Sequence, residues 1–349
     1  MNSINNKTND INVTVDKRTE LLSILVWISD YNKLCPVRNK HLANDKYIDN
    51  IINKFSRYKD EKAVRLFEEL YKKHDYFFYD SPINLFLQLD EDFGCSKIND
   101  YVYKETLEQD NLVYEFLNEL KPFADKIGFN DYYNSNIKDY EKYVDCVSKV
   151  IGDRDISSFI KNYYGYDSSK EFNINLLPAY SQGGYNVTLD DSIFCNSAVQ
   201  DWAREDNLFP GIDDILVVHE LSHGYVDTLT DKYKLVTEDT DIFDDIKEDM
   251  AKYAYPTDKE ILNEHIIKGI ECRYLLHTYN DENMYNDYIN SDLSKKFKYL
   301  PIILGSLEEY ENNRDTYKTF DIYYPKVIEN IKIFIEDKRR NSNEIYSRK

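Results

Sequence analysis

Apolar residues recur at spacings of three and four along most of the first 162 residues, and this spacing predicts a largely helical region. A first helix is predicted from Asp16, whose side chain can cap it, to about Tyr31. Before it, residues 11–15 alternate like a short strand, and residues 1–10 are polar and rich in asparagine, which is typical of a loose arm. Further helical patterns cover residues 47–58, 62–73, 83–89, 101–120 and 140–151.

The pattern changes near residue 170, where strict alternation replaces helical spacing. Apolar positions from Phe172 to Leu176 alternate with two asparagines, which predicts a strand with one buried and one polar face. Residues 185–189 repeat this alternation, and residues 193–195 indicate a third short strand. We therefore expect a small antiparallel sheet in this part of the chain.

Helical spacing returns after this sheet, and a helix is predicted to begin at Asp213 or Asp214, where a carboxylate meets the positive end of the helix dipole. A later helix has a clearer start. Thr257 and Glu260 fit the capping box, in which each side chain accepts a hydrogen bond from the free backbone N–H of the other residue. This helix is predicted to continue to about His277.

These patterns predict an α+β fold that is predominantly α-helical. Residues 1–165 form a mostly helical N-terminal region, and residues 166–340 hold the small sheet and the helices that follow it. The last helical pattern covers residues 322–336, and residues 341–349 form a charged tail.

The charge of the chain excludes several classes of protein. Its 349 residues carry 44 Lys and Arg against 64 Asp and Glu, a formal net charge of −20. Binding of nucleic acid is not expected, because phosphate contacts need a basic surface. No run approaches the ~18 apolar residues that a membrane helix needs, so no membrane span is expected.

The first residues of the chain and the cysteines bear on its expected cellular location. The first 15 residues lack both the basic start and the apolar core of a secretory signal, which predicts a cytoplasmic protein. The five cysteines, at positions 35, 95, 146, 195 and 272, show no C-x-x-C spacing. A disulfide framework or a cysteine zinc site is therefore not expected.

One motif carries recognisable chemistry: the helix predicted from Asp213 or Asp214 contains H-E-x-x-H, formed by His219, Glu220 and His223. Four residues advance a helix by about 400°, so both imidazoles lie on one face and can reach a single Zn²⁺ at roughly 2.0–2.1 Å. Glu220 can then take the proton of an attacking water.

Chance and burial both argue that this motif holds a metal. A sequence with six histidines is expected to contain roughly 0.01 accidental copies of H-E-x-x-H. The helix is also apolar nearly all round, which predicts that it is buried. Burying two histidines and a glutamate without a compensating metal would be unfavourable.

A zinc site with an open position needs a third protein ligand, for which the candidates are Asp227, Glu264, Glu271 and His277. Asp227 lies one turn beyond His223 and fits better as an acceptor for a histidine N–H, or as an ordinary surface acid. Glu264 and Glu271 both lie on the helix capped by a threonine, among apolar neighbours. Glu264 is nearer the helix start and is the preferred ligand, with Glu271 as the alternative.

These residues carry a resemblance to a known class. The segment His219-Glu-Leu-Ser-His223, followed by Asn263-Glu264 on a later helix, resembles the gluzincin class of zinc metallopeptidases. Residues 15–23, the pair Gly183-Gly184 and residues 264–269 also resemble a bacterial zincin-like family catalogued as a domain of unknown function, over about residues 13–280.

This resemblance implies a zincin-like core with H-E-x-x-H on the active-site helix. One Zn²⁺ per chain would be held by His219, His223 and Glu264, and Glu220 would act as general base in peptide hydrolysis. Lys268, one turn after Glu264, would face the same cleft as a donor to the oxyanion. Other candidates for that role are Tyr225, Arg273, Tyr274 and His277.

The resemblance also implies how a substrate would bind, and one departure bears on the site. In zincins the substrate strand commonly pairs with a sheet edge, which here would come from residues 181–188, where Gly183 and Gly184 permit close approach. As a departure, Lys268-Gly269 stands where the family usually has Arg-Ala. The lysine keeps the charge but lacks the planar fork of arginine.

The sequence therefore predicts a zinc-dependent peptidase that acts on a peptide or protein substrate. Two alternatives stay open. The chain can be a binding or regulatory module that retains its zinc, or a zinc hydrolase of a non-peptide bond. An intact Glu220 favours catalysis, because a structural zinc site needs no general base.

Overall fold

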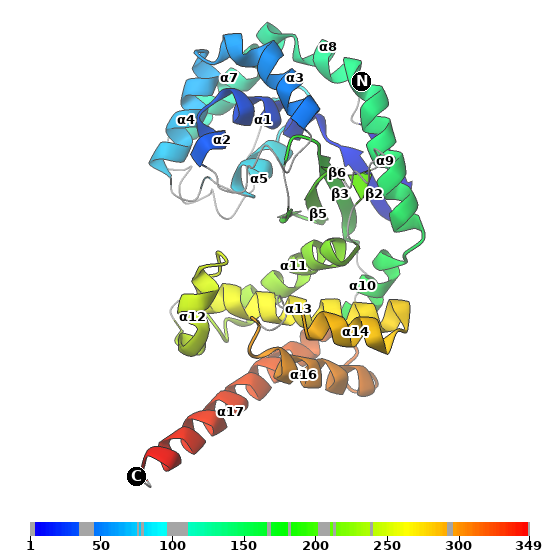
Figure 1. Cartoon of the computed structure of the whole chain (residues 1–349), viewed down its shortest axis with the longest axis vertical. Helices are drawn as coiled ribbons and strands as arrows, with labels where there is room; N and C mark the ends of the chain where they lie inside the picture. Colours follow the sequence, from blue (N-terminus) through cyan, green and yellow to red (C-terminus); the bar gives the residue numbers. More distant parts are fainter. Residues whose placement is uncertain are drawn as a thin grey trace. The chain divides into compact units, whose positions relative to one another are not determined.

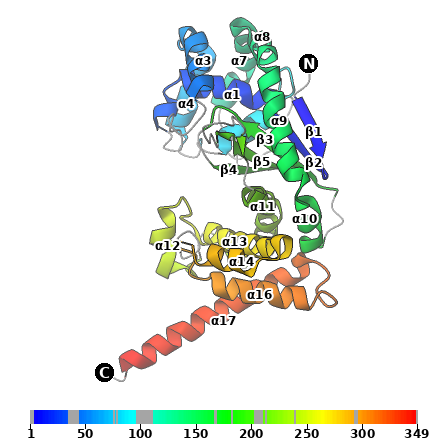
Figure 2. The ribbon, with the colours of Figure 1, turned by 45° about the vertical axis from the view of Figure 1, so that its right-hand side comes forward.

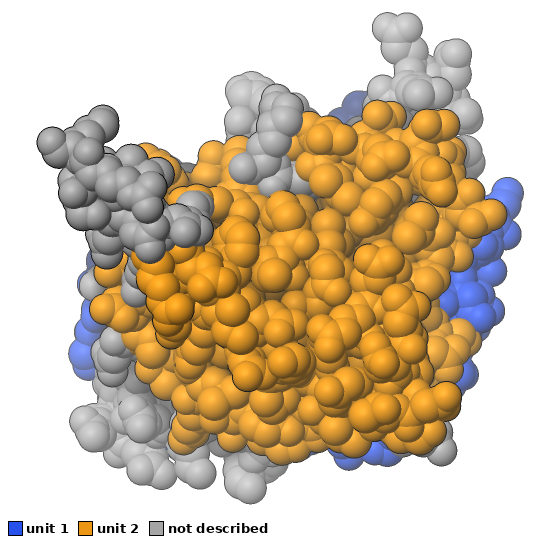
Figure 3. Space-filling model, turned by 90° about the horizontal axis from the view of Figure 1, so that it is seen from below, with its two compact units in different colours: residues 1–155, 169–220 blue, residues 156–168, 221–349 orange. Residues whose placement is uncertain are grey.

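A computed structural model describes residues 4–34, 45–74, 77, 80–95, 111–165, 169–180, 183–201, 210–211, 214–237, 240–291 and 296–347. The chain divides into two compact units, coloured separately in Figure 3. The first comprises residues 1–155 and 169–220, and the second residues 156–168 and 221–349. Predicted features at Cys35, residues 101–110 and residues 181–182 lie outside the described residues.

The first unit surrounds a mixed sheet with helices (Figure 1). Asp16 accepts a hydrogen bond from the backbone N–H of Arg18, so the predicted cap of the first helix is confirmed. That helix is buried on every side from Thr19 to Ile28. The helices of this unit are α1 (Lys17–Ile28), α2 (Tyr31–Leu34), α3 (Asp45–Phe55), α4 (Lys62–Lys73), α5 (Ser81–Leu87), α7 (Asn111–Ile127), α8 (Phe129–Ser135) and α9 (Ile137–Gly152).

The sheet contains five strands in the order β1-β2-β3-β5-β4. The two pairs at its edges, β1 with β2 and β4 with β5, are antiparallel, whereas β2 with β3 and β3 with β5 are parallel. Figure 2 shows α9 running beside β1 and β2. The strands are β1 (Ile4–Thr8), β2 (Ile11–Val15), β3 (Glu171–Leu177), β4 (Gly184–Leu189) and β5 (Ser192–Ala198), and a separate pair joins β6 (Gln200–Asp201) to β7 (Pro210–Gly211).

Two expectations about the strands were wrong. The sheet is mixed rather than antiparallel, because β4 turns back through Asp190 to pair with the outer edge of β5, leaving β3 parallel to β5. The segment expected as a loose arm forms β1, which pairs with β2 through Asn5 and Asn6 despite its polar composition.

The polar face of β3 is buried, in contrast to its predicted exposure. Asn175 and Asn196 are fully buried, and the amide of Asn175 donates to Oδ1 of Asn196 at 2.8 Å. The amide of Asn175 also donates to the hydroxyl of Thr19 on α1 at 3.2 Å. Paired amides satisfy one another, so α1 can cover this face without leaving buried polar groups unbonded.

The second unit is a helical assembly around α13. Its elements are α10 (Ile156–Tyr164), the part of α11 (Asp214–Tyr233) after Glu220, α12 (Asp244–Ala251), α13 (Asp258–Tyr279), α14 (Glu282–Ile289), α16 (Leu300–Asn312) and α17 (Phe320–Ser347). The predicted capping box of α13 is confirmed, since Thr257 and Glu260 make both reciprocal contacts. Helix α17 continues to Ser347, through most of the segment expected as a charged tail.

Tight aromatic and glycine contacts hold this assembly together. Tyr164 of α10 stacks on Tyr225 of α11 with ring centroids 4.2 Å apart. A Cβ on Gly269 would lie only 2.6 Å from Ile303 and 2.8 Å from Leu307, so glycine lets α16 approach α13 closely. This contact gives a packing reason for the glycine beside Lys268. Within the described part of the chain, no helix combines the length and apolar character needed to cross a membrane.

Candidate metal centre

Helix α11 brings the H-E-x-x-H residues together. The motif lies near the middle of this 20-residue helix, whose Val217, Val218 and Leu221 are fully buried. Residues four apart share a helix face, so the apolar packing that fixes the rotation of α11 also fixes the direction of His219 and His223. Glu220 is also buried, with 5% of its surface exposed.

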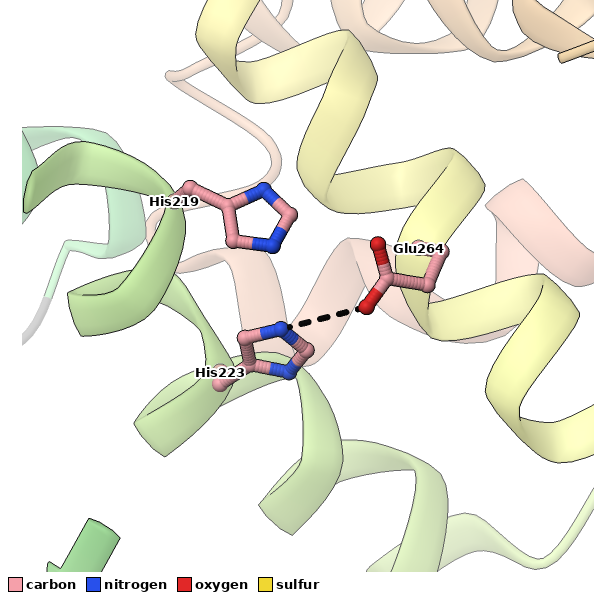
Figure 4. A group of neighbouring side chains, drawn as sticks. All are labelled: His219, His223 and Glu264. Carbon is pink, nitrogen blue, oxygen red and sulfur yellow. Dashed lines mark ion pairs between the residues drawn. The ribbon is translucent and has the colours of Figure 1, made fainter. Parts of the chain in front are cut away.

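Glu264 of α13 completes a three-residue cluster. One ligand atom from each of His219, His223 and Glu264 lies within 4.8 Å of the other two. Figure 4 shows both imidazoles directed toward the Glu264 carboxylate. Nε2 of His223 lies 3.3 Å from Oε1 of Glu264, and two ligands of one tetrahedral zinc lie about 3.3–3.6 Å apart. The donor set and spacing thus fit a metal ion with two nitrogen ligands and one oxygen ligand.

The second ring nitrogen of His223 is held by a carboxylate. Nδ1 of His223 lies 3.2 Å from both carboxylate oxygens of Asp227, one turn later on α11. Burial alone would lower the pKa of His223, but Asp227 and Glu264 outweigh it and hold that pKa well above its usual range. A histidine must be neutral to bind a metal, so metal binding would release this proton. The arrangement matches the expectation that Asp227 accepts a histidine N–H.

A chain of hydrogen bonds fixes Asp227 in turn. The side-chain amide of Asn263 donates to Oδ1 of Asp227 at 2.7 Å. The hydroxyl of Thr230 donates to Oδ1 of Asn263 at 2.5 Å and lies 2.5 Å from the hydroxyl of Tyr324 on α17. The residue before Glu264 therefore orients His223 through Asp227, and α17 supports that arrangement.

Glu220 lies against the edge strand β4. A Cβ on Gly184 would lie 2.5 Å from Oε1 of Glu220 and 2.8 Å from its Cγ, closer than van der Waals contact allows. The side-chain amide of Asn186 donates to the backbone oxygen of Glu220 at 2.7 Å. The backbone at Gly184 thus leaves room for the carboxylate, and Asn186 ties β4 to α11 at the same residue.

Lys268 and Glu271 form an ion pair on the face of α13 that carries Glu264. Nζ of Lys268 lies 2.9 and 2.7 Å from the two carboxylate oxygens of Glu271, and both side chains are buried. The hydroxyl of Tyr288 on α14 lies 3.1 Å from Nζ and also contacts Glu271. Glu264, and not Glu271, belongs to the histidine cluster, while the role of Lys268 as an oxyanion donor stays a prediction.

The remaining candidates have other partners. Arg273 pairs with Glu311 of α16, donating from Nε to Oε1 at 2.7 Å, and His277 lies 3.1 Å from Oε2 of the same carboxylate. Burial of Glu311 opposes its ionisation, but His277 and Arg273 outweigh burial and lower its pKa to about 2. Tyr225 and Tyr274 are buried in aromatic contacts. None of these four residues belongs to the cluster formed by the described histidines and Glu264.

Comparison with protein families places the chain in one of them. The profile of a family described as Domain of unknown function (DUF4932) matches residues 11–330. The chain belongs to this family. The predicted resemblance to a family of unknown function is confirmed, whereas membership of a zinc metallopeptidase class stays a prediction. No curated protein and no solved structure matches this DUF4932 chain.

Several residues around the site were not identified from the sequence of this DUF4932 chain. Asn186, Thr230 and Tyr324 lie 34, 33 and 94 positions from their partners, so no local pattern marks them. Asn263 precedes Glu264 of the histidine cluster, and the Asn-Glu pair was the one available signal of its role.

Proposed function

We propose that this chain is a zinc-dependent peptidase in which His219, His223 and Glu264 hold the metal and Glu220 is the general base. The observation that carries the proposal is the convergence of the three ligand atoms beside a buried Glu220. Two imidazoles and one carboxylate with an open fourth position are typical of catalytic zinc rather than structural zinc. When bound there, zinc would supply Lewis-acid chemistry that activates water and polarises a carbonyl.

Three further residues of the chain would have separate roles in the reaction. Glu220 would take the proton from the attacking water and deliver it to the leaving amine. Asp227 would hold the His223 imidazole with its Nε2 turned toward Glu264. Lys268 is the candidate donor to the oxyanion, and it would have to exchange its contact with Glu271 for one with the substrate.

An extended peptide is the substrate that suits the neighbouring strand. Strand β4 is last in the order of the sheet, so one of its edges has no partner strand among the described residues. A peptide paired with that edge would pass close to Glu220 at Gly184. The described part of the predicted substrate edge is residues 183–188, because residues 181–182 lie outside it.

Two alternatives make different predictions. A binding or regulatory module would keep the metal and show no turnover, and a hydrolase of another bond would turn over non-peptide substrates only. The buried general base beside the ligands favours an enzyme, since a structural zinc site has no use for Glu220.

The first test is metal content, measured by elemental analysis of tag-free protein purified without added metal. We expect one zinc per chain, followed by cleavage in a peptide library. Glu220→Gln should retain the zinc and lose hydrolysis, because it keeps the shape of the side chain but cannot accept the proton. Protein that takes up no metal even after incubation with zinc would contradict the proposal, as would full turnover by Glu220→Gln.

A further inference from the structure

The edge strand β4 contacts the proposed base at two points. The first is Gly184, where an added Cβ would meet both Oε1 and Cγ of Glu220. The second is Asn186, whose amide nitrogen donates to the Glu220 backbone oxygen at 2.7 Å. Residues two apart on a strand share a face, so both contacts come from the face of β4 turned toward α11.

The reason for glycine at position 184 is space rather than backbone conformation. Gly183 has a positive φ of 98°, which favours glycine, whereas Gly184 has no positive φ. The backbone of Gly184 therefore does not itself require glycine, but a Cβ at this position would displace the carboxylate of Glu220 or the end of Leu216. Leu216 can adjust because the contact is the end of a flexible side chain, whereas Cγ of Glu220 is close to its helix.

Asn186 is itself held in register. It lies opposite Cys195 in the antiparallel pair of β4 with β5, and its Oδ1 accepts a hydrogen bond from Thr188 at 3.1 Å. The pairing of β4 with β5 and the hydrogen bond from Thr188 thus direct the side-chain amide of Asn186 at α11. A helix carbonyl such as that of Glu220 has a second lone pair, so it can accept this bond without losing its helical partner.

We propose that Gly184 and Asn186 are positioning residues for the Glu220 carboxylate, so that the strand edge sets the direction of the base. The inference rests on the proposed function for its catalytic consequence, while the contacts themselves are independent of it. Gly184 defines where the carboxylate can lie, and Asn186 fixes the helix turn from which it projects. A displacement of about 1 Å at such a group lowers turnover by about 10²-fold.

The test compares Gly184→Ala with Gly305→Ala, the same change on α16 at a glycine with no atom within 4 Å of an added Cβ. We expect Gly184→Ala to bind one zinc, to lose about 10²-fold in kcat with a smaller change in KM, and to shift the acid limb of the pH profile that reports the base. Gly305→Ala should match the wild type in zinc content, in kcat and KM, and in its pH profile. Unchanged kcat and pH profile in Gly184→Ala would overturn the inference.

A second measurement needs no activity. In metal-free protein, Gly184→Ala should lower Tm by a few degrees when Glu220 is present and by much less in a Glu220→Ala background, where the two conflicting atoms of Glu220 are gone and only the flexible end of Leu216 remains. Equal losses in the two backgrounds would show that the glycine serves general packing and would overturn the inference. If the wild type cleaves no peptide, the proposed function fails, and this cycle alone decides whether the positioning contact exists.

A third variant covers the case in which Gly184→Ala does not fold. Asn186→Ala removes the hydrogen bond to Glu220 without adding an atom to the contact. We expect it to keep its zinc and lose about tenfold in kcat, whereas Thr188→Ala, which removes only the support of Asn186, should lose less. An Asn186→Ala variant with wild-type kcat would contradict its role.

Discussion

The side-chain amide of Asn263 donates a hydrogen bond of 2.7 Å to Oδ1 of Asp227. Asp227 in turn contacts Nδ1 of His223, whose other ring nitrogen faces Glu264. The adjacent residues Asn263 and Glu264 therefore act on the same histidine from its two sides. Such outer contacts fix the tautomer and the orientation of a ligating imidazole, so their loss is expected to weaken metal binding.

Removing either partner of this hydrogen bond should lower metal affinity. We expect Asp227→Ala and Asn263→Ala each to weaken zinc binding by about 10–100-fold, because His223 loses its orientation. Competition with a chromophoric chelator measures the change. Asp231→Ala, one turn later on α11 where Asp231 pairs with Lys259, is the matched control and should bind zinc normally. Equal affinity in Asp227→Ala and the control would refute this prediction.

The two glutamates considered as third ligand should respond differently. Glu264→Ala removes an atom of the ligand cluster and should abolish stoichiometric zinc binding. Glu271→Ala should retain zinc but lower the free energy of unfolding, because it leaves the Lys268 ammonium buried without its partner. Metal analysis and urea unfolding measure the two effects. Loss of zinc from Glu271→Ala alone would reverse the assignment.

A buried carboxyl in the first unit should make stability depend on pH. Glu20 is 1% exposed, and burial raises its pKa from 4.5 to about 7, although hydrogen bonds from Tyr47 and Tyr140 oppose the shift. Its Oε1 has no hydrogen-bond partner among the described residues. The folded state therefore holds this proton more tightly than the unfolded state.

Because the pKa of Glu20 is raised on folding, the contribution of Glu20 to stability is fully present below pH 4.5 and is lost as the pH rises through 7. The loss attributable to Glu20 is about 3 kcal/mol at pH 8. Glu20→Gln, which resembles the neutral acid, should remove this dependence in urea unfolding at pH 5 and pH 8. Glu69→Gln, an exposed change on α4, should leave the dependence unchanged. A wild-type difference that persists in Glu20→Gln would contradict the prediction.

Features set by local chemistry could be predicted from the sequence. The cap at Asp16 and the capping box of Thr257 with Glu260 depend on residues two or three apart, and both are present. The spacing of His219 and His223 on one helix face is local in the same sense. Glu264 was predicted from its neighbours and from a resemblance, and it joins the cluster.

Features set by distant pairing could not be predicted in the same way. Strand β2 pairs with β3 through residues about 160 positions apart, and nothing in either segment specifies a parallel neighbour. Asn175 alternates with apolar residues as an exposed position would, yet Asn196 and Thr19 satisfy it inside the core. The need for glycine at position 269 likewise becomes clear only from α16, which packs against it.

Lys268 is the residue whose role a paired substitution should settle. Lys268→Met alone leaves Glu271 buried without its ion pair, which is expected to lower the free energy of unfolding by about 3–5 kcal/mol. Replacing both, as Lys268→Met with Glu271→Leu, should restore most of that stability, because apolar groups of similar volume tolerate the same site.

The double variant separates the ion pair from catalysis because its fold and its zinc should both be intact. If Lys268 donates to the oxyanion, as proposed, kcat should fall by about 10²-fold while zinc content stays at one per chain. Tyr288→Phe, which removes the hydroxyl that contacts both charges, is the control for disturbance of α14 and should keep most of its turnover. A double variant with wild-type kcat would assign Lys268 to the ion pair alone.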